Sequence, residues 1–559
     1  MTMRTAAHIL GASALAFAAA GMSPAHAQEM LFLAEDVPAG LNYDGPAAAI
    51  PTSQTGMVNV MEPLFGYATN PANESGVITP DFAKFEGRLV EDWSFDPETL
   101  TWTLNLRKGV EGCDGATFNA DDVVYTFARG KSVSGAAPIG WFLSNVASIA
   151  NFTPDVFGDE AARELGDEVV KVDDYTVTIR QSEPNALFLP VLTIFGLYIF
   201  DKELMDANGS DDDPWAHDYT NNVNVPSFGP YCVERWTKDD EIVFVANDNY
   251  YRGAPAIKRV VMKKVPQSSN RVVVLRSGQA QLVQGLTPRE FESLRGVDGI
   301  SVGSVSGNEN LFVHMNFDVP PFDNIAVRRA VAHAIPTRQI IDNAYFGQAT
   351  RWAGHVPSSY PGYHESAAQY DYDPETSKAL LAEAGYPGGA GLDEFGEAFQ
   401  LTYVSEKETT LGPTVNAIAT AMREIGFPVT LNPIPQTQYG DRQLVKRDLP
   451  FAVNDQEKPI GVDAGYATQL FFVSPESGGL NNMVNYRNAE MDGIWSNARI
   501  EADSTARDAL LVDIQEILMR DVVWAPVVEY ATQWAYSDQV KGMQWHADNS
   551  VRFVDLSIE

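Results

Sequence analysis

Polar and apolar residues alternate strictly over residues 100–106. Trp102, Leu104 and Leu106 fall on one face of an extended segment, and the residues between them are polar. This period of two is typical of a strand with one buried face. The pattern therefore predicts a half-buried strand over this range.

Four later segments show the longer period of an amphipathic helix. Three of them begin at residues that cap helices well, Asn119, Asn324 and Asp373, and the fourth runs up to Gly426, a typical helix stop. Their apolar stripes are Val123, Val124 and Phe127; Val327, Ala330, Val331 and Ala334; Leu380, Leu381 and Ala384; and Val415, Ile418, Met422 and Ile425. Each stripe predicts a helix with one face in a core.

Further runs rich in β-branched residues, 257–265 and 271–275, predict strands between these helices. Strands and helices that alternate along a chain indicate an α/β or mixed-sheet architecture. The segment 208–213 is polar and acidic, but it lacks the spacing of acids and glycine that an EF-hand needs. We therefore expect a solvated loop there and not a calcium site.

The first 27 residues have the features of a secretory signal peptide. Arg4 precedes an apolar stretch over 9–20, and Ala25-His26-Ala27 forms a small-x-small site that predicts cleavage before Gln28. The apolar stretch is shorter than the ~20 residues that cross a membrane. Because no cysteine follows the cleavage site, we expect no lipid anchor, and a free periplasmic protein.

The amino-acid composition and net charge limit the class of protein and the partners that it can bind. The chain has 559 residues, of which 45% are hydrophobic and 20% charged, which is ordinary for soluble globular domains and long enough for roughly three or four of them. Its net charge of −35 disfavours nucleic acid as a partner. An acidic surface attracts cationic solutes but is equally an adaptation to a salty habitat, so charge alone identifies no ligand.

Motifs for catalysis and metal binding are absent from the sequence. There is no GxSxG elbow, Walker loop, GxGxxG opening, CxxC pair or HExxH helix, so we expect no metal and no cofactor. A triad assembled from distant residues would escape this search. The two cysteines, Cys113 and Cys232, could pair in an exported protein, but a chain with this much core does not need a disulfide.

Eight short motifs, found in order over nearly the whole mature chain, resemble the motifs of one known protein family. They are the segments 62–65, 101–110, 114–124, 229–231, 249–255, 275–278, 327–330 and 373–387. As an ordered set they resemble bacterial extracellular solute-binding protein family 5, the peptide- and nickel-type binding proteins of ABC importers. Most of these residues are expected to be scaffold, because turn residues and apolar stripes predominate among them.

The resemblance implies an α/β, two-lobed periplasmic binding protein with mixed sheets, hinge crossovers and an extra subdomain in lobe one. Mapped onto this chain, lobe one comprises residues 28–305 plus 525–559, with the inserted subdomain at about 58–184, and lobe two comprises 306–524. The crossing at 308–316 is the expected hinge.

The resemblance also implies a function: a periplasmic receptor that captures a small solute and delivers it to the membrane permease of an ABC importer. The expected solute is a peptide or a related cationic or zwitterionic compound, and the receptor is expected to be a monomer and no enzyme. The alternatives are an exported hydrolase with a discontinuous active site, or a chaperone-like or sensory protein on the same scaffold.

Peptide-binding relatives use an acidic residue of the second lobe to bind the ligand's amino group, and Asp463 occupies the position that resembles it. An equally good interpretation of Asp463 is a helix cap. The relatives usually carry a tryptophan just before the acid, whereas this chain has Ile460, Gly461 and Val462. Peptide specificity is therefore in question.

Further binding candidates come from both lobes. In lobe two a dense charged set would suit a cationic or zwitterionic solute if it lies in a cleft: Asp455, Glu457, Lys458 and Asp463. In lobe one the candidates are Glu35 and Tyr43, after the first mature strand, and Trp141 and Phe142 as an apolar or stacking wall. Aromatic residues at such positions are more often part of a core.

Overall fold

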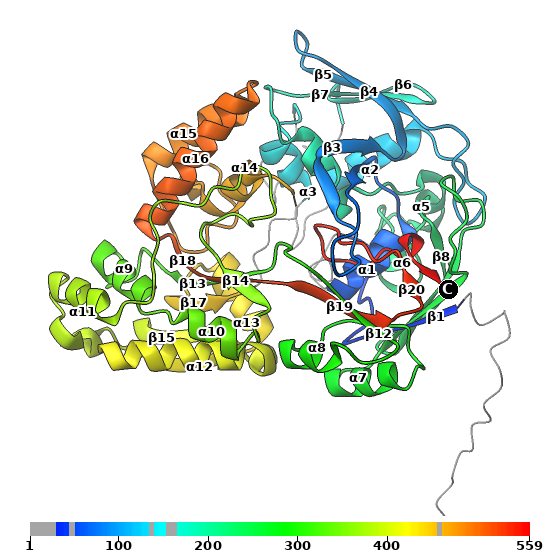
Figure 1. The fold of residues 1–559 in the computed structure, drawn as a ribbon. Coiled ribbons are helices and arrows are strands. Elements are labelled where there is room, and N and C mark those ends of the chain that lie inside the picture. The colour runs from blue at the N-terminus through cyan, green and yellow to red at the C-terminus, as the bar shows by residue number, and fades with distance from the viewer. Residues whose placement is uncertain (1–28, 44–50, 133–138, 152–164, 456–460) are drawn as a thin grey trace, which may run out of the picture.

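Two lobes, each built on its own β-sheet, make up this computed structural model (Figure 1). It describes residues 29–43, 51–132, 139–151, 165–455 and 461–559. The predicted signal peptide lies outside the described residues. Two segments cross between the lobes, one after residue 305 and one at Ala531. The predicted two-lobed α/β fold with mixed sheets is therefore confirmed.

Lobe one is organised by a seven-stranded mixed sheet in the order β12-β19-β11-β1-β10-β9-β8. Strand β1 (Glu29–Ala34) lies in the middle and runs parallel to β10 (Arg259–Lys264) and β11 (Leu282–Val283). The other pairings are antiparallel. These strands are β8 (Tyr231–Thr237), β9 (Glu241–Ala246), β12 (Ile300–Val305) and β19 (Thr532–Ser537). The predicted strand at 257–265 is confirmed as β10.

An inserted unit extends lobe one at the top of Figure 1. Its four-stranded antiparallel sheet has the order β4-β5-β7-β6, and a hairpin precedes it. The strands are β2 (Phe65–Thr69), β3 (Pro80–Gly87), β4 (Val90–Asp96), β5 (Thr101–Leu106), β6 (Val169–Asp173) and β7 (Thr176–Arg180). The alternating segment is β5, and helix α2 (Ala120–Ser132) begins where Asn119 Oδ1 accepts the amide of Asp121 at 2.7 Å. Both predictions are confirmed.

The remaining elements of lobe one are short and pack around these sheets. They are α1 (Pro51–Val60), α3 (Ile139–Trp141), α4 (Phe188–Leu192), α5 (Lys202–Asn208), α6 (His217–Asn222), α7 (Ser268–Arg276), α8 (Pro288–Leu294), β20 (Val540–Lys541) and β21 (Ser557–Ile558). Helix α1 is unusual because nine of its ten residues are buried, including its polar first half. Ser53 Oγ accepts the amide of Ala39 at 3.0 Å, and Asn59 Nδ2 donates to the carbonyl of Thr55 at 2.8 Å. The hydroxyls of Thr52 and Thr55, in contrast, have no hydrogen-bond partner among the described residues.

Lobe two is built on a six-stranded sheet in the order β14-β18-β13-β17-β15-β16. The strands are β13 (Asn310–Met315), β14 (Ala349–Arg351), β15 (Gln400–Val404), β16 (Thr430–Ile434), β17 (Phe451–Asn454) and β18 (Trp524–Tyr530). The helices are α9 (Ile325–His333), α10 (Thr337–Asn343), α11 (Pro374–Glu383), α12 (Glu408–Ile425), α13 (Gln436–Gly440), α14 (Ala464–Ala467), α15 (Ala489–Ile500) and α16 (Ser504–Asp521).

Three predicted helices of lobe two are confirmed with their end signals. Asn324 accepts the amide of Ala326 at 2.9 Å and so caps α9. Asp373 accepts two backbone amides at the start of α11. Gly426 ends α12 in a left-handed conformation, with a φ of 119°, which costs a glycine little.

Two predictions about chain course differ from the structure. Residues 271–275, predicted as a strand, lie in helix α7, where Arg271 and Leu275 share the buried face and Val273 points to solvent. The spacing of four between the buried residues outweighs the β-branched composition. Residues 525–530 lie in β18, so the second crossing comes at Ala531 and not at 525.

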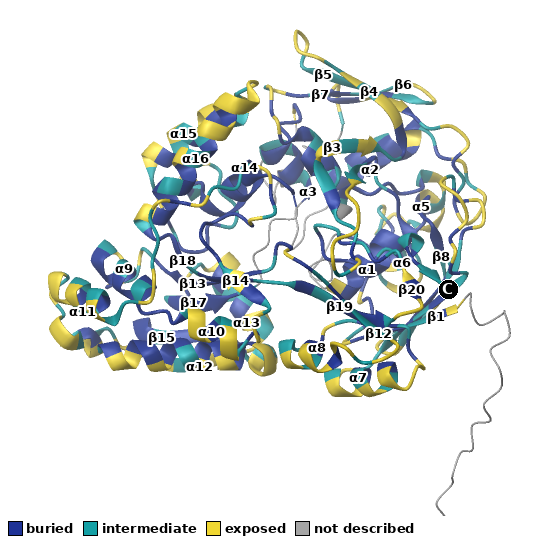
Figure 2. Ribbon diagram, viewed as in Figure 1, coloured by how far each residue is buried: buried dark blue, intermediate teal, exposed yellow. Residues whose placement is uncertain are grey.

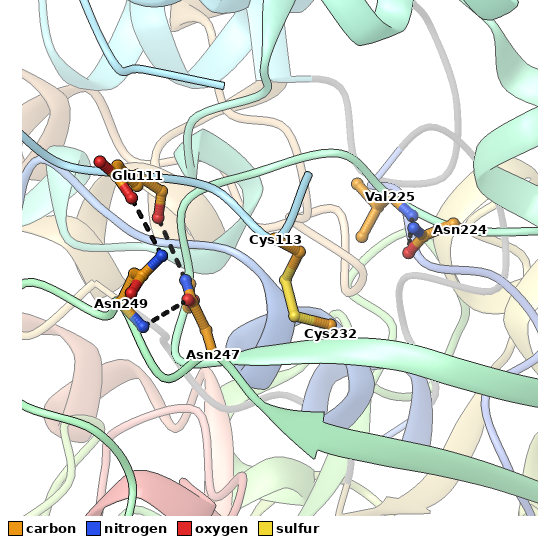
Figure 3. Close-up of a disulfide and its surroundings, with 8 residues drawn as sticks. Glu111, Cys113, Asn224, Val225, Cys232, Asn247 and Asn249 are labelled. Atoms are coloured by element: carbon orange, nitrogen blue, oxygen red, sulfur yellow. Dashed lines mark hydrogen bonds between the residues drawn. A yellow bond between two sulfur atoms is a disulfide. The ribbon is translucent and has the colours of Figure 1, made fainter. Parts of the chain in front are cut away.

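The cysteine expectation is corrected by a disulfide between Cys113 and Cys232. Figure 3 shows Cys113, in the turn that follows β5, bonded to Cys232 of β8. Beside it, Asn249 Nδ2 donates to Glu111 Oε2 at 3.0 Å. The bridge ties the inserted unit to the main sheet of lobe one across 119 sequence positions, a separation from which local sequence cannot show that the side chains meet.

Burial is greatest at the sheets and along the boundary between the lobes (Figure 2). One apolar cluster contains residues of both lobes, for example Phe142 and Tyr466. A second cluster fills lobe two between its sheet and helices α9 and α12. Within the described ranges, no helix is both long and apolar enough to span a membrane.

Candidate functional site

A cavity of about 260 Å³ lies where the two lobes and their crossings meet, and we call it the interlobe cavity. Lobe one contributes the segment after β11 and the start of α8, including Gln284 and Phe291. Lobe two contributes the segment after α10, the start of α12 and the residue after β17. A molecule in this cavity would therefore contact both lobes.

The parallel strands β15 and β17 of lobe two bring a charged pair to the cavity. Asp455 follows β17 directly, and Lys407 lies in the turn after β15. Because both strands end at the same edge of the sheet, the two side chains meet, and Lys407 Nζ donates to the two Asp455 oxygens at 2.9 and 3.0 Å. Asp455 lines the cavity, and its side chain is only 10% exposed.

The first crossing contributes a second carboxylate, that of Glu309. It accepts hydrogen bonds from Asn549 Nδ2 and, at 3.2 Å, from the Tyr530 hydroxyl. The Tyr530 ring stacks on Tyr345, with ring centroids 5.4 Å apart. Burial raises the pKa of both phenols, and the nearby carboxylates of Glu309 and Asp455 raise it further. Both phenol hydroxyls therefore stay protonated and can donate hydrogen bonds beside the carboxylates.

Two glutamine oxygens of the cavity lining have no hydrogen-bond partner, Gln284 Oε1 in lobe one and Gln348 Oε1 in lobe two. The Gln348 amide is oriented by Glu292, which accepts a bond from Gln348 Nε2 at 3.0 Å. A carboxylate accepts and does not donate, so the nitrogen of Gln348 faces Glu292 and the oxygen is left over. Both lobes thus offer the cavity an unused acceptor.

Away from the cavity the lobes contact each other directly. The Phe142 ring of lobe one lies nearly parallel to the Tyr466 ring of lobe two, with centroids 6.1 Å apart. Glu183 of lobe one forms an ion pair with Arg499 at the end of α15. These contacts join the two lobes at positions outside the cavity.

Asp463 does not line this cavity. Its carboxylate accepts the Gly465 amide at 2.6 Å, which caps α14, and both of its oxygens accept bonds from Arg507 at 2.6 and 3.0 Å. The alternative interpretation of Asp463 as a helix cap is therefore confirmed. Its ion partner lies 44 positions away in sequence, so local sequence could not reveal it.

The other predicted site residues lie at different places along the lobe boundary. Glu35 is exposed near Arg271, whose pKa burial lowers and the Glu35 carboxylate raises. Tyr43 is buried, in the apolar cluster that also contains Phe142 and Tyr466. The structure thus brings Tyr43 and Phe142 into one cluster, apart from Asp455.

Three candidate residues cannot be placed, because Glu457, Lys458 and the side chain of Trp141 lie outside the described residues. Sequence reasoning also missed several residues of the interlobe cavity: Glu309, Tyr345, Gln284, Gln348 and the supporting Lys407. The one available signal was position, since Glu309 lies inside the predicted hinge segment. Nothing local marks the two glutamines.

A larger cavity, of about 360 Å³, lies wholly within lobe one and is called the lobe-one cavity. Its charged groups bind one another: Arg552 donates to both Asp548 oxygens, at 2.6 and 2.5 Å, and His546 lies 3.0 Å from Asp555. Burial by itself would raise the pKa of Asp548, but Arg552 outweighs it and lowers the value to about 2. These charged groups of the lining already have partners, whereas the Tyr67 hydroxyl in the same lining has none within the described part of the chain.

Two kinds of residue could act on a bound molecule, metal ligands and nucleophiles at the interlobe cavity. No group of three or more histidine, cysteine, aspartate or glutamate side chains in the described part of the chain could hold a metal ion. Among the described residues that line the interlobe cavity there is no cysteine, serine or histidine. The arrangement suits the capture of a molecule by hydrogen bonds, charge and apolar contact.

Comparison with known proteins bears on the same lobes. Residues 84–474 match the family described as bacterial extracellular solute-binding proteins, family 5 Middle. Heme-binding protein A of Haemophilus influenzae is 26% identical over 468 residues, which cover 82% of this chain and 81% of that protein. The dipeptide-binding protein of Escherichia coli is 29% identical over 321 residues, covering 56% and 58%.

Solved structures share the fold. The ABC transporter-associated periplasmic binding protein DppA from Helicobacter pylori, in complex with the peptide STSA, superposes with a TM-score of 0.76 at 22% identity, covering 95% of this chain and 98% of that one. HbpA2 from Haemophilus parasuis gives a TM-score of 0.72 at 21% identity, with coverage of 95% and 100%. At these identities the likeness concerns architecture.

Proposed function

Because the chain belongs to the bacterial extracellular solute-binding proteins of family 5, and is therefore a substrate-binding receptor, we propose that it captures a small solute in the interlobe cavity. The solute is a peptide or a related cationic or zwitterionic compound. Relatives named for dipeptides and for glutathione are consistent with that chemistry.

The observation that carries the proposal is the position of the cavity. It is bounded by both lobes and by both crossings, so a solute there makes contacts that exist only when the lobes are together. A ligand stabilises a conformation by its differential affinity for it. Binding therefore favours the closed arrangement, which a permease can distinguish from an open one.

The proposed setting is the periplasm, and the proposed partner is the membrane permease of an ABC importer. The predicted signal peptide and the family support both. The receptor acts as a monomer, binds no nucleic acid and releases its solute unchanged. No described arrangement of side chains at the cavity supports the hydrolase alternative.

Among the predicted site residues we assign different roles. Asp455 contacts the solute directly, because it lines the cavity. At the lobe boundary around the cavity, Glu35 contributes negative charge near Arg271. Tyr43 and Phe142 contribute apolar packing there. Asp463 supports lobe two through α14 and Arg507.

Calorimetry of the mature protein against peptides, amines, oligosaccharides and metal chelates tests the proposal. We expect saturable binding with one solute per chain and no turnover of the bound compound by mass spectrometry. Silence across the panel, or chemical conversion of a bound compound that stops with a single substitution at the cavity, would contradict the receptor function.

A further inference from the structure

We propose, on the premise of the function above, that the interlobe cavity selects a solute that carries a positive charge and no free carboxylate, such as an organic amine or guanidinium compound. The described residues that line the cavity include the carboxylates of Glu309 and Asp455 and no lysine, arginine or histidine. A buried carboxylate on the solute would therefore meet like charge and no cationic partner.

Two cations bonded to residues of the lining, Lys407 and Arg271, do not line the cavity themselves. Lys407 stands behind Asp455 and donates to both of its oxygens, and it is absent from the lining. Arg271 donates to the backbone carbonyls of Val265, Pro266 and Gly285, at 2.5, 3.0 and 2.6 Å. Arg271 Nε has no partner, but neither Arg271 nor Lys407 is among the described residues that line the cavity, so the lining itself offers a solute carboxylate no cationic partner.

The uncharged polar groups of the cavity favour a donor-rich solute as well. Gln284 Oε1 and Gln348 Oε1 have no partner in the structure, and each comes from a different lobe. A buried acceptor without a donor destabilises the site that contains it. An ammonium or guanidinium group supplies several donors and no acceptor, so it can satisfy both glutamines while it balances a carboxylate.

Size and apolar lining describe the rest of the solute. The volume of about 260 Å³ lies just below the ~300–1,000 Å³ of typical small-molecule sites and suits one compact molecule. Phe291, Tyr345 and Trp534 contribute aromatic surface, on which apolar chains, rings and cations all pack favourably. The inferred class is a small amine or guanidinium compound with an apolar portion.

Three matched sets of compounds test this inference by calorimetry. Tyramine, tyrosine and 3-(4-hydroxyphenyl)propionate share one skeleton. Tyramine carries only an ammonium group, tyrosine carries an ammonium group and a carboxylate, and the propionate carries only a carboxylate. Agmatine with arginine, and cadaverine with lysine, repeat the comparison without an aromatic ring. A dipeptide, Ala-Phe, represents the zwitterionic peptides.

We expect that amines bind tighter than their carboxylate-bearing counterparts by about tenfold or more, the effect of one unpaired buried charge or charge-assisted hydrogen bond. Tighter binding of the amino acids, of the carboxylate or of Ala-Phe overturns the inference and leaves the receptor function intact. The inference is also overturned if none of the seven compounds in the three sets binds while a compound of another class does. Silence of every compound contradicts the receptor function itself.

Substitutions then place the effect in the cavity. Gln284→Met and Gln348→Met remove an acceptor with little change in volume, and we expect each to weaken amine binding roughly fivefold to tenfold. Gln539→Met, in an exposed turn of lobe one, is the matched control and leaves affinity unchanged. Wild-type affinity in both cavity variants, with thermal unfolding also unchanged, would exclude this cavity as the amine site.

Discussion

The interlobe cavity and the lobe-one cavity differ less in size than in the hydrogen-bond partners that their polar groups have. The lobe-one cavity is the larger, at about 360 Å³, but its arginine, histidine and carboxylates bind one another. The interlobe cavity, at about 260 Å³, leaves glutamine oxygens of both lobes without donors. What distinguishes the two cavities is therefore less their volume than the state of their polar groups: charged groups paired with one another in one, and amide oxygens of two different lobes without donors in the other.

The largest effect should come from the lobe-one cavity. Arg552→Met leaves Asp548 buried without its cation and removes the donor to the Tyr198 hydroxyl. Breaking a buried pair on one side costs about 3–5 kcal/mol, so the free energy of unfolding should fall by that amount in urea titration. The amine affinity of the remaining folded protein should not change. Loss of binding with intact stability would contradict the comparison.

A somewhat smaller loss of stability is expected at Asp463. Asp463→Asn leaves Arg507 without its ion partner, although the amide can still cap α14. We expect a loss of about 3 kcal/mol in unfolding free energy. Solute affinity measured well below the melting temperature should be that of the wild type. If Asp463 bound a solute amine instead, affinity would fall and stability would not.

At the interlobe cavity a substitution should lower solute affinity more than it lowers stability. Asp455→Asn removes a carboxylate from the lining and leaves Lys407 nearby without its partner. Calorimetry should show a tenfold to hundredfold loss of affinity for the tightest-binding amine, about 1.4–2.7 kcal/mol. Lys407→Met, which frees the same carboxylate, should raise amine affinity. A change in the same direction for both variants would contradict the assignment of Asp455.

The smallest effect is expected at the direct contact between the lobes. Glu183→Gln removes the ion pair with Arg499. The side chain of Glu183 is 32% exposed and that of Arg499 is 28% exposed. A partly exposed pair contributes about 0–1 kcal/mol, so solute affinity should fall fivefold at most. Glu98→Gln, at an exposed site of the inserted unit, is the control. A larger loss than that of Asp455→Asn would locate the main binding energy outside the cavity.

Local signals in the sequence predicted much of the scaffold. Caps at Asn119, Asn324 and Asp373, and the stop at Gly426, fixed the limits of helices because each acts within one turn. Residues 271–275 misled because β-branched composition resembles a strand, while the buried face repeats every four residues. The ordered motifs indicated the two lobes.

The candidate site was less accessible to prediction because its partners come from distant segments. Asp455 was predicted as a charged residue near a cleft, but its pair with Lys407 depends on two strands ending at the same edge of a sheet. Asp463 and Arg507, and the two cysteines, meet only in the folded chain. Gln284 and Gln348 carry no local signal, since an unpartnered oxygen is a property of the assembled cavity.

Small-angle X-ray scattering tests the central claim, that the lobes close on a solute held at their crossings. The mature protein is unfolded to release any bound solute, refolded, and measured with and without the tightest-binding amine. The account predicts a smaller radius of gyration with the amine, and no such change in the Asp455→Asn variant at the same concentration. An identical radius in the wild type, under conditions where calorimetry shows saturation, would contradict it.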